Sequence, residues 1–263
     1  MTYTHGHAES VLRSHRTRTA ANSAAYLLPR LRTSDRLLDV GSGPGTITAD
    51  LARLVGDVVA LETDDHAASL TRAELDRQGV TNVEVRVGDV HALELLDGEF
   101  DVVHAHQVLQ HVADPVTALR EMARVTRRGG VVAVRDSDYA AFAWFPRLPG
   151  LDRWLALYEA AARANGGEPD AGRHLLAWAH AAGLTDVTTS SSTWCFATPE
   201  TRTWWGDMWA DRITGSALSD QLVAEGRASA EELREIADAW RAWAADPDGL
   251  IWIPHVEVVI RVP

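Results

Sequence analysis

Residues 37–45 read LLDVGSGPG, an apolar run that leads directly into a turn with three glycines. Because glycine lacks a Cβ atom, its backbone adopts left-handed angles and approaches a ligand closely. A helix predicted to begin near Thr46 would then direct unpaired N–H groups and the positive end of its dipole at that ligand. The stretch therefore predicts a strand, a turn and a helix that together bind an anionic or polar small molecule.

Short apolar runs alternate with longer amphipathic ones between about residue 35 and residue 137. This alternation is typical of repeated strand–helix–strand units around a parallel sheet, in which right-handed crossovers place helices on both faces. The expected strands are 36–40, 57–62, 83–87, 101–105 and 130–135, and the expected helices are 46–55, 65–78 and 115–127.

The pattern changes after residue 137. Two mainly helical segments, 138–182 and 199–249, carry most of the ten tryptophans, and we expect them to form a helical cap inserted into the domain. Strands at 184–196 and 251–262 would complete the sheet. Residues 1–30 are expected to form an N-terminal arm and helix, so that residues 1–263 make one domain around a core at 35–137 that binds the ligand.

The composition excludes several classes of function. A formal net charge of −12 argues against nucleic acid as a partner, because such binders gather Lys and Arg to neutralise phosphates. All 25 basic residues are arginine, which excludes lysine Schiff-base chemistry. A single cysteine, Cys195, cannot form an intramolecular disulfide. No apolar run approaches the roughly 20 residues of a membrane span, so we expect no membrane partner and a cytoplasmic protein.

The glycine turn departs from the fingerprint of dinucleotide-binding proteins. That fingerprint places its third small residue where this chain has Thr46, whereas Gly45 comes one residue early. This departure counts against NAD as the ligand. A nucleotide-dependent oxidoreductase on a similar fold and a non-catalytic, cofactor-bound scaffold remain as alternative functions.

Five motifs in order resemble those of class I S-adenosylmethionine-dependent methyltransferases. They are DVGSGPG at 39–45, VVALE at 58–62, GDV at 88–90, the run 100–112 and the run 121–130. Within that family the chain is most similar to the ubiquinone and menaquinone biosynthesis C-methyltransferases, although the long segment 199–249 departs from those compact enzymes. The resemblance implies an α/β fold with a Rossmann-like, seven-stranded, mostly parallel sheet, helices on both faces and a helical cap insertion.

The resemblance also implies S-adenosylmethionine as cofactor and assigns residues to it. Glu62 is expected to accept hydrogen bonds from both ribose hydroxyls, and Asp89 from the adenine amino group, while the backbone N–H of Val90 meets the adenine ring. The expected cofactor-binding residues are Asp39, Gly41, Ser42, Gly43, Gly45, Glu62, Thr63, Asp89, Val90, His106, Gln107 and His111.

Two histidines are candidate general bases. His106 and His111 lie at or just after the carboxyl end of the fourth expected strand, where open α/β sheets bind ligands. A histidine titrates near neutral pH and so can take a proton from a phenol or an activated carbon. The alternative is that both line the cofactor pocket. We expect no metal, because the histidines of the N-terminal arm lack a defined ligand geometry.

The aromatic residues of the expected cap favour a flat or hydrophobic acceptor. We therefore expect transfer of a methyl group to oxygen or carbon of a small aromatic or hydrophobic metabolite. For the oligomeric state, a homodimer is one of the alternatives. A tryptophan more often fills a core than contacts a ligand. The candidate acceptor-binding residues are Tyr3, His15, Trp144, Trp204, Trp205 and Trp209.

Overall fold

The computed structural model describes residues 15–263, which divide into two compact units. The sheet unit comprises residues 15–136, 171–192 and 256–263, and the described part of the helical unit comprises residues 137–170 and 193–255. Tyr3, a candidate acceptor-binding residue, lies outside the described residues.

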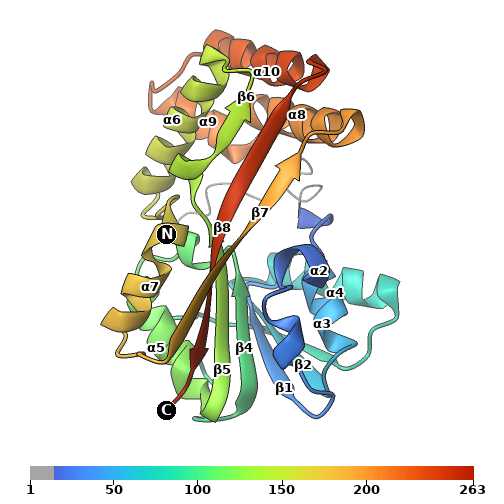
Figure 1. The fold of residues 1–263 in the computed structure, drawn as a ribbon, viewed down its shortest axis with the longest axis vertical. Coiled ribbons are helices and arrows are strands. Elements are labelled where there is room, and N and C mark those ends of the chain that lie inside the picture. The colour runs from blue at the N-terminus through green and yellow to red at the C-terminus, as the bar shows by residue number, and fades with distance from the viewer. Residues whose placement is uncertain (1–14) are drawn as a thin grey trace. The chain divides into compact units, whose positions relative to one another are not determined.

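The sheet of the sheet unit is built mostly from parallel strands (Figure 1). Its strands are β1 (Arg36–Val40), β2 (Asp57–Glu62), β3 (Val83–Val87), β4 (Phe100–His106), most of β5 (Thr126–Ser137) and parts of β7 (Val187–Phe196) and β8 (Leu250–Arg261). The strand order is β3-β2-β1-β4-β5-β8, with β7 also pairing with β8, and the four pairs among β1 to β5 are parallel. The Rossmann-like α/β fold expected from the sequence is confirmed.

Helices cover both faces of this sheet (Figure 1). The α-helices are α2 (Ala20–Ser23), α3 (Thr46–Ala52), α4 (Asp65–Gln78), α5 (Pro115–Val125) and α7 (Ala171–Ala181), and the 3-10 helices are η1 (Leu28–Arg30) and η2 (Leu109–His111). The side chains of Asp64 and Asp114 cap α4 and α5 by accepting the N–H groups of Ala67 and Thr117. An N-cap of this kind satisfies one of the orphan donors of the first turn.

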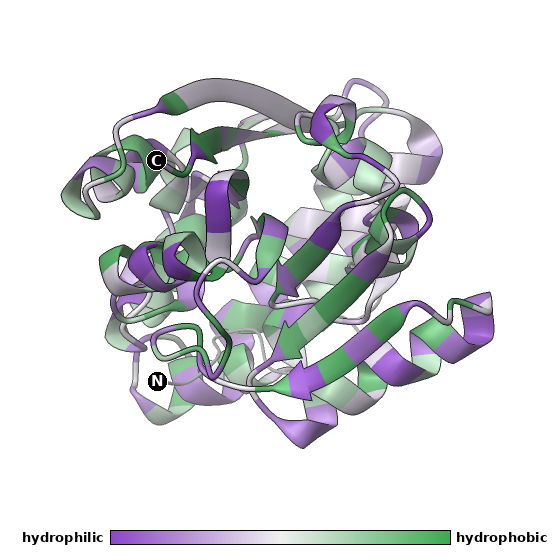
Figure 2. Cartoon of the chain, turned by 90° about the horizontal axis from the view of Figure 1, so that it is seen from below, coloured by the Kyte–Doolittle hydropathy of each residue, from purple (hydrophilic) through white to green (hydrophobic). Residues whose placement is uncertain are grey.

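Alternate residues of each strand pack on opposite faces of the sheet, because strand side chains have a period of two. Leu38 of β1 packs in a core with Leu119 of α5 and Leu175 of α7, whereas its neighbour Leu37 packs with Leu51 of α3 in a second core. Figure 2 shows mainly hydrophobic strands beside helices that carry both hydrophilic and hydrophobic residues, the pattern of amphipathic helices on a buried sheet.

Two helices end earlier than the sequence predicts. Helix α3 ends at Ala52 instead of residue 55, since the N–H of Gly56 bonds to the carbonyl of Asp35 and turns the chain into β2. Helix α5 ends at Val125, because Thr126 pairs with Phe100 as the first residue of β5.

Helix α7 falls within the segment 138–182 that we expected to belong to the cap, yet it lies in the sheet unit. Its side chains Leu175 and Ala179 are fully buried in a core of that unit. The apolar stripe of α7 therefore covers the sheet. Helical periodicity shows that a helix has an apolar face, but not whether that face packs on a sheet or on other helices.

The helical unit contains helices α6 (Pro149–Ala164), α8 (Pro199–Thr214), α9 (Ala217–Ala224) and α10 (Ala230–Ala245), and η3 (Tyr139–Ala141). It also contains β6 (Ala143–Phe145), a strand that the sequence did not predict and that pairs antiparallel with the first residues of β8. Tryptophans form the centre of its core: the ring of Trp154 lies 4.6 Å from that of Trp209 and 4.9 Å from that of Trp240.

Helices α8 and α10 approach closely at Gly206. An added Cβ atom there would lie 2.7 Å from the Cβ of Ala244 and 2.9 Å from the carbonyl oxygen of Trp240. Because overpacking a tight contact costs about 1–3 kcal/mol, we expect Gly206→Val to lower the free energy of unfolding by about that amount in urea denaturation. The control is Gly215→Ala, whose added Cβ meets only the carbonyl of Asp211 at 3.4 Å; equal stability of the two variants would contradict this packing.

Among residues 15–263, none of the helices combines the length and the apolar character needed to cross a bilayer.

Candidate functional site

The glycine turn lies at the carboxyl end of β1. Gly41, Gly43 and Gly45 all have positive φ angles, of 68°, 57° and 87°, which explains why glycine occupies each position. An added Cβ on Gly41 would lie 2.5 Å from a methyl carbon of Val108, so the loop after β4 packs directly on the turn. An added Cβ on Gly43 would meet no described atom within 4 Å. The backbone at Gly43 is therefore open for a ligand.

Thr71, on the buried face of α4, holds the turn in place. Its hydroxyl donates to the carbonyl of Gly43 at 2.7 Å and lies 3.1 Å from the hydroxyl of Ser42. The sequence analysis missed Thr71, since nothing in the amphipathic pattern of α4 marks a threonine that contacts a turn 28 residues earlier. Its contacts preorganise the backbone that a ligand would meet.

Glu62 ends β2 with a carboxylate directed at the same turn. One carboxylate oxygen accepts the backbone N–H of Gly43, and the other accepts the N–H of Thr63 at 3.3 Å. Burial raises the pKa of Glu62 to about 7, against the lowering effect of these two N–H groups, and the charge of Asp39 raises it further. Each oxygen can accept a further hydrogen bond, so the carboxylate can receive two hydroxyls of a sugar.

Asp39 uses both carboxylate oxygens within the protein. One accepts the hydroxyl of Thr48 at 2.6 Å, and the other lies 2.7 Å from Nδ1 of His104, its register partner on β4. These contacts tie β1 to α3 and β4 beneath the glycine turn. Asp39 therefore positions the glycine turn, in addition to the cofactor-binding role expected from the resemblance.

Asp89 follows β3 and is exposed, whereas its neighbour Val90 is buried in the core of the sheet unit. One carboxylate oxygen accepts the backbone N–H of His91 at 2.9 Å and lies 2.6 Å from its ring Nδ1. The backbone hydrogen bond, followed by the ring, lowers the pKa of Asp89. The carboxylate is thus ionised at neutral pH and can accept a hydrogen bond from an amino group.

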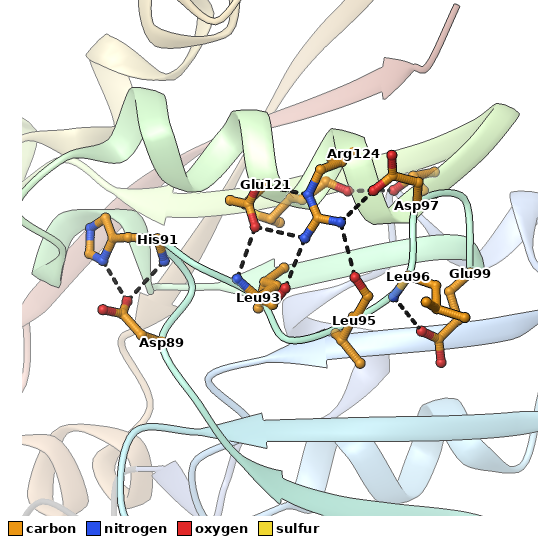
Figure 3. A network of polar contacts seen from close by, with 11 residues as sticks. Asp89, His91, Leu93, Leu95, Leu96, Asp97, Glu99, Glu121 and Arg124 are labelled. Carbon is orange, nitrogen blue, oxygen red and sulfur yellow. Dashed lines mark hydrogen bonds and ion pairs between the residues drawn. The ribbon is translucent and has the colours of Figure 1, made fainter.

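The loop that follows Asp89 is held by Arg124 of α5 (Figure 3). The guanidinium donates to the carbonyls of Leu93 and Leu95 at 2.8 and 3.0 Å and to the carboxylate of Glu121 at 2.8 Å. Glu121 in turn accepts the N–H of Leu93 at 2.9 Å. This network explains the spacing of the two residues in the motif at 121–130, since one helical turn brings both side chains to the loop.

The two candidate bases differ in their surroundings. Nδ1 of His106, a buried residue at the end of β4, lies 3.5 Å from the guanidinium of Arg135. Burial lowers the pKa of His111 to about 3, with a smaller contribution from Arg18. At neutral pH His111 is uncharged but binds a proton weakly, which disfavours it as a general base. Gln107, between them, has a positive φ of 55° and donates its N–H to the carbonyl of Arg135 at 2.7 Å.

A buried charged cluster next to β4 escaped the sequence analysis. Arg135 of β5 lies 3.3 Å from the carboxylate of Glu257 and donates to the hydroxyl of Ser192, while Ser190 and Ser192 donate to Glu257. Asp136, the next residue, is fully buried, and burial raises its pKa to about 7. The apolar run of the expected strand 130–135 ends just before these charges, so its pattern could not signal them.

The candidate acceptor-binding residues do not share one environment. The backbone carbonyl of His15 accepts the hydroxyl of Thr46 at 3.4 Å, beside the start of α3. Trp144, Trp205 and Trp209 are buried in the core of the helical unit, which accounts for them through packing, whereas Trp204 is half-buried. Their contact with an acceptor remains a prediction.

Comparison with known proteins agrees with this geometry. Residues 38–134 match the family model described as a methyltransferase domain. An uncharacterized methyltransferase of Schizosaccharomyces pombe is 34% identical over 98% of this chain and 96% of its own length. A ubiquinone/menaquinone biosynthesis C-methyltransferase of Bdellovibrio bacteriovorus is 35% identical, but over only 41% of this chain and 45% of its own length.

The YcgJ protein of Bacillus subtilis has a similar fold, with a TM-score of 0.61 at 17% identity over 91% of this chain and 97% of that one. The chain belongs to the S-adenosylmethionine-dependent methyltransferase family. This confirms the class of enzyme expected from the motifs.

Proposed function

We propose that the sheet unit binds S-adenosylmethionine at the glycine turn and that the enzyme transfers its methyl group to oxygen or carbon of a small aromatic or hydrophobic metabolite. The cofactor would supply an electrophilic methyl group bonded to a positively charged sulfur. The observation that carries the proposal is the pairing of an open backbone at Gly43 with the buried carboxylate of Glu62, both at the carboxyl ends of adjacent strands.

The residues present fit this cofactor. Glu62 would receive the ribose hydroxyls, the exposed Asp89 would receive the adenine amino group, and the open side of Gly43 leaves room for the ligand. The side chain of Val90 is buried in the core of the sheet unit, so it would fix the loop whose backbone N–H meets the adenine ring. This chain's residues thus bind and orient the cofactor, and orientation supplies much of the rate of a displacement reaction.

Calorimetric titration with S-adenosylmethionine, S-adenosylhomocysteine and NAD(H) tests the proposal. We expect micromolar binding of the first two, and a loss of about 10²-fold or roughly 2.7 kcal/mol in Gly43→Val, because the added side chain occupies the ligand's space. Gly79→Val is the matched control: Gly79 also has a positive φ, of 65°, and an equally open Cβ position, but it ends α4.

Binding of neither sulfur ligand by the parent chain would overturn the proposal, and tight binding of NAD(H) alone would favour the oxidoreductase. Retained binding in Gly43→Val together with a loss in Gly79→Val would place the ligand elsewhere. A scaffold without catalysis predicts binding of the cofactor but no methylated product from any acceptor.

A further inference from the structure

Asp136 stands out among the buried acids because part of its carboxylate is unused. It follows Arg135 near the carboxyl end of β5 and has no exposed surface. One oxygen, Oδ1, accepts the backbone N–H of Gln110 at 3.3 Å. The other, Oδ2, is buried and has no hydrogen-bond partner among residues 15–263. A buried carboxylate oxygen without a partner is costly, so its retention points to a functional partner.

The loop after β4 connects this carboxylate to the proposed cofactor site. Val108 packs on Gly41 of the glycine turn, and Gln110, two residues later, donates to Asp136. Strand β4 pairs with β1 on one side and with β5 on the other. With strands about 4.8 Å apart, Asp136 lies two strands, or roughly 10 Å, from the turn along the same edge of the sheet. A ligand that extends from the turn past β4 would therefore end close to this carboxyl, and contact with Oδ2 would require the groups that cover it to move.

Both protonation states of this carboxyl are accessible at neutral pH. Burial raises its pKa to about 7, while the N–H groups of Gln110 and Leu109 and the charges of Arg135 and Arg18 pull in the opposite direction. Tyr26 also lies near it, and its buried hydroxyl stays protonated because burial raises its pKa. Glu257 and His106 contact Arg135, the residue before Asp136. A base with a pKa near 7 suits proton transfer at physiological pH, unlike His111.

Resting on the proposed function, we propose that Asp136 is the proton acceptor of the methyl-transfer centre. Its carboxylate receives the proton of the acceptor's O–H or acidic C–H group through Oδ2. In the same reaction the new O–C or C–C bond forms, the bond between methyl carbon and sulfur breaks with its electron pair going to sulfur, and the proton later leaves to water. The substrate class is therefore a weak oxygen or carbon acid.

The charge of the bound ligand should change the pKa of the Asp136 carboxyl. A sulfonium close to Asp136 favours the carboxylate, which is ready to accept a proton, and loss of that charge on transfer favours the protonated form. Binding of S-adenosylmethionine should then release more protons than binding of S-adenosylhomocysteine. Glu62 faces the ribose, which both ligands share, so its contribution cancels in the comparison.

Proton release is measured by calorimetric titration at pH 7 in two buffers of different ionisation enthalpy. For the parent chain we expect S-adenosylmethionine to release up to about half a proton more than S-adenosylhomocysteine, because the pKa lies near the pH. In Asp136→Asn this difference should vanish. Asp35→Asn is the matched control: Asp35 is also a buried aspartate of the sheet unit, but it precedes β1.

The parent chain offers a second measurement that needs no variant. Since the sulfonium complex prefers the carboxylate, affinity for S-adenosylmethionine relative to S-adenosylhomocysteine should rise severalfold from pH 6 to pH 8. A flat ratio, equal proton release by the two ligands, or a difference that survives Asp136→Asn would overturn the inference while leaving cofactor binding intact. Binding of neither ligand would overturn the proposed function and this inference with it.

Discussion

Glu62→Ala is expected to weaken binding of S-adenosylmethionine by about 10²- to 10⁴-fold. Two charge-assisted hydrogen bonds from ribose hydroxyls, each contributing about 1.5–3 kcal/mol, would be lost together with the acceptor for the N–H of Gly43. Titration calorimetry of both proteins at pH 8, where the carboxyl of Glu62 is ionised, gives the ratio of dissociation constants. An unchanged affinity would remove Glu62 from the site.

A second variant separates loss of binding from loss of folding. The pKa of Glu62 is about 7 in the folded chain, against an ordinary value of 4.5. Because the folded state favours the protonated acid, ionisation of Glu62 destabilises the fold as pH rises from about 4.5 to 7, and the cost is complete above 7. Glu62→Gln should therefore raise the free energy of unfolding of the ligand-free protein at pH 8 by up to about 3 kcal/mol, yet weaken binding. A less stable variant at pH 8 would contradict this account.

Three of the strands could be predicted from the sequence to the residue, whereas β4 is one residue longer at each end than expected. Strands β1, β2 and β3 match the ranges expected for them, because apolar runs in a parallel sheet are bounded by glycines and acids. The same local pattern made Glu62 a candidate, because its acidic side chain ends an apolar run. The candidate site residues that could be proposed from the sequence are those that a local motif marks.

Contacts between distant segments could not be predicted in the same way. Thr71 and Gly43 are 28 residues apart, and Arg135 and Glu257 are 122 residues apart, so no local period connects them. Tryptophans such as Trp209 suggested an acceptor surface, but their role in the core of the helical unit depends on how four helices pack. Tertiary packing, which propensity does not encode, decides these cases.

Arg135→Met is expected to lower the free energy of unfolding by about 3–5 kcal/mol, since it leaves the buried carboxylate of Glu257 without its cation. The side chains of Arg135 and Glu257 are 1% and 6% exposed, so water cannot replace the lost partner. Burial lowers the pKa of Arg135 to about 10, yet the guanidinium stays charged at neutral pH. Urea denaturation of both proteins at pH 7.5 measures the difference.

The double variant Arg135→Met with Glu257→Gln tests whether charge is the cause. A neutral amide needs no cation. Ser190 and Ser192 now donate to different oxygens of Glu257, so the amide oxygen of glutamine can accept one of these hydroxyls while its NH2 group donates to the other. We therefore expect the double variant to recover most of the stability lost in the single one, because removing both charges is often nearly neutral whereas removing one is not. A double variant no more stable than Arg135→Met would instead show that the arginine acts through its packing, and would weaken the electrostatic account of this cluster.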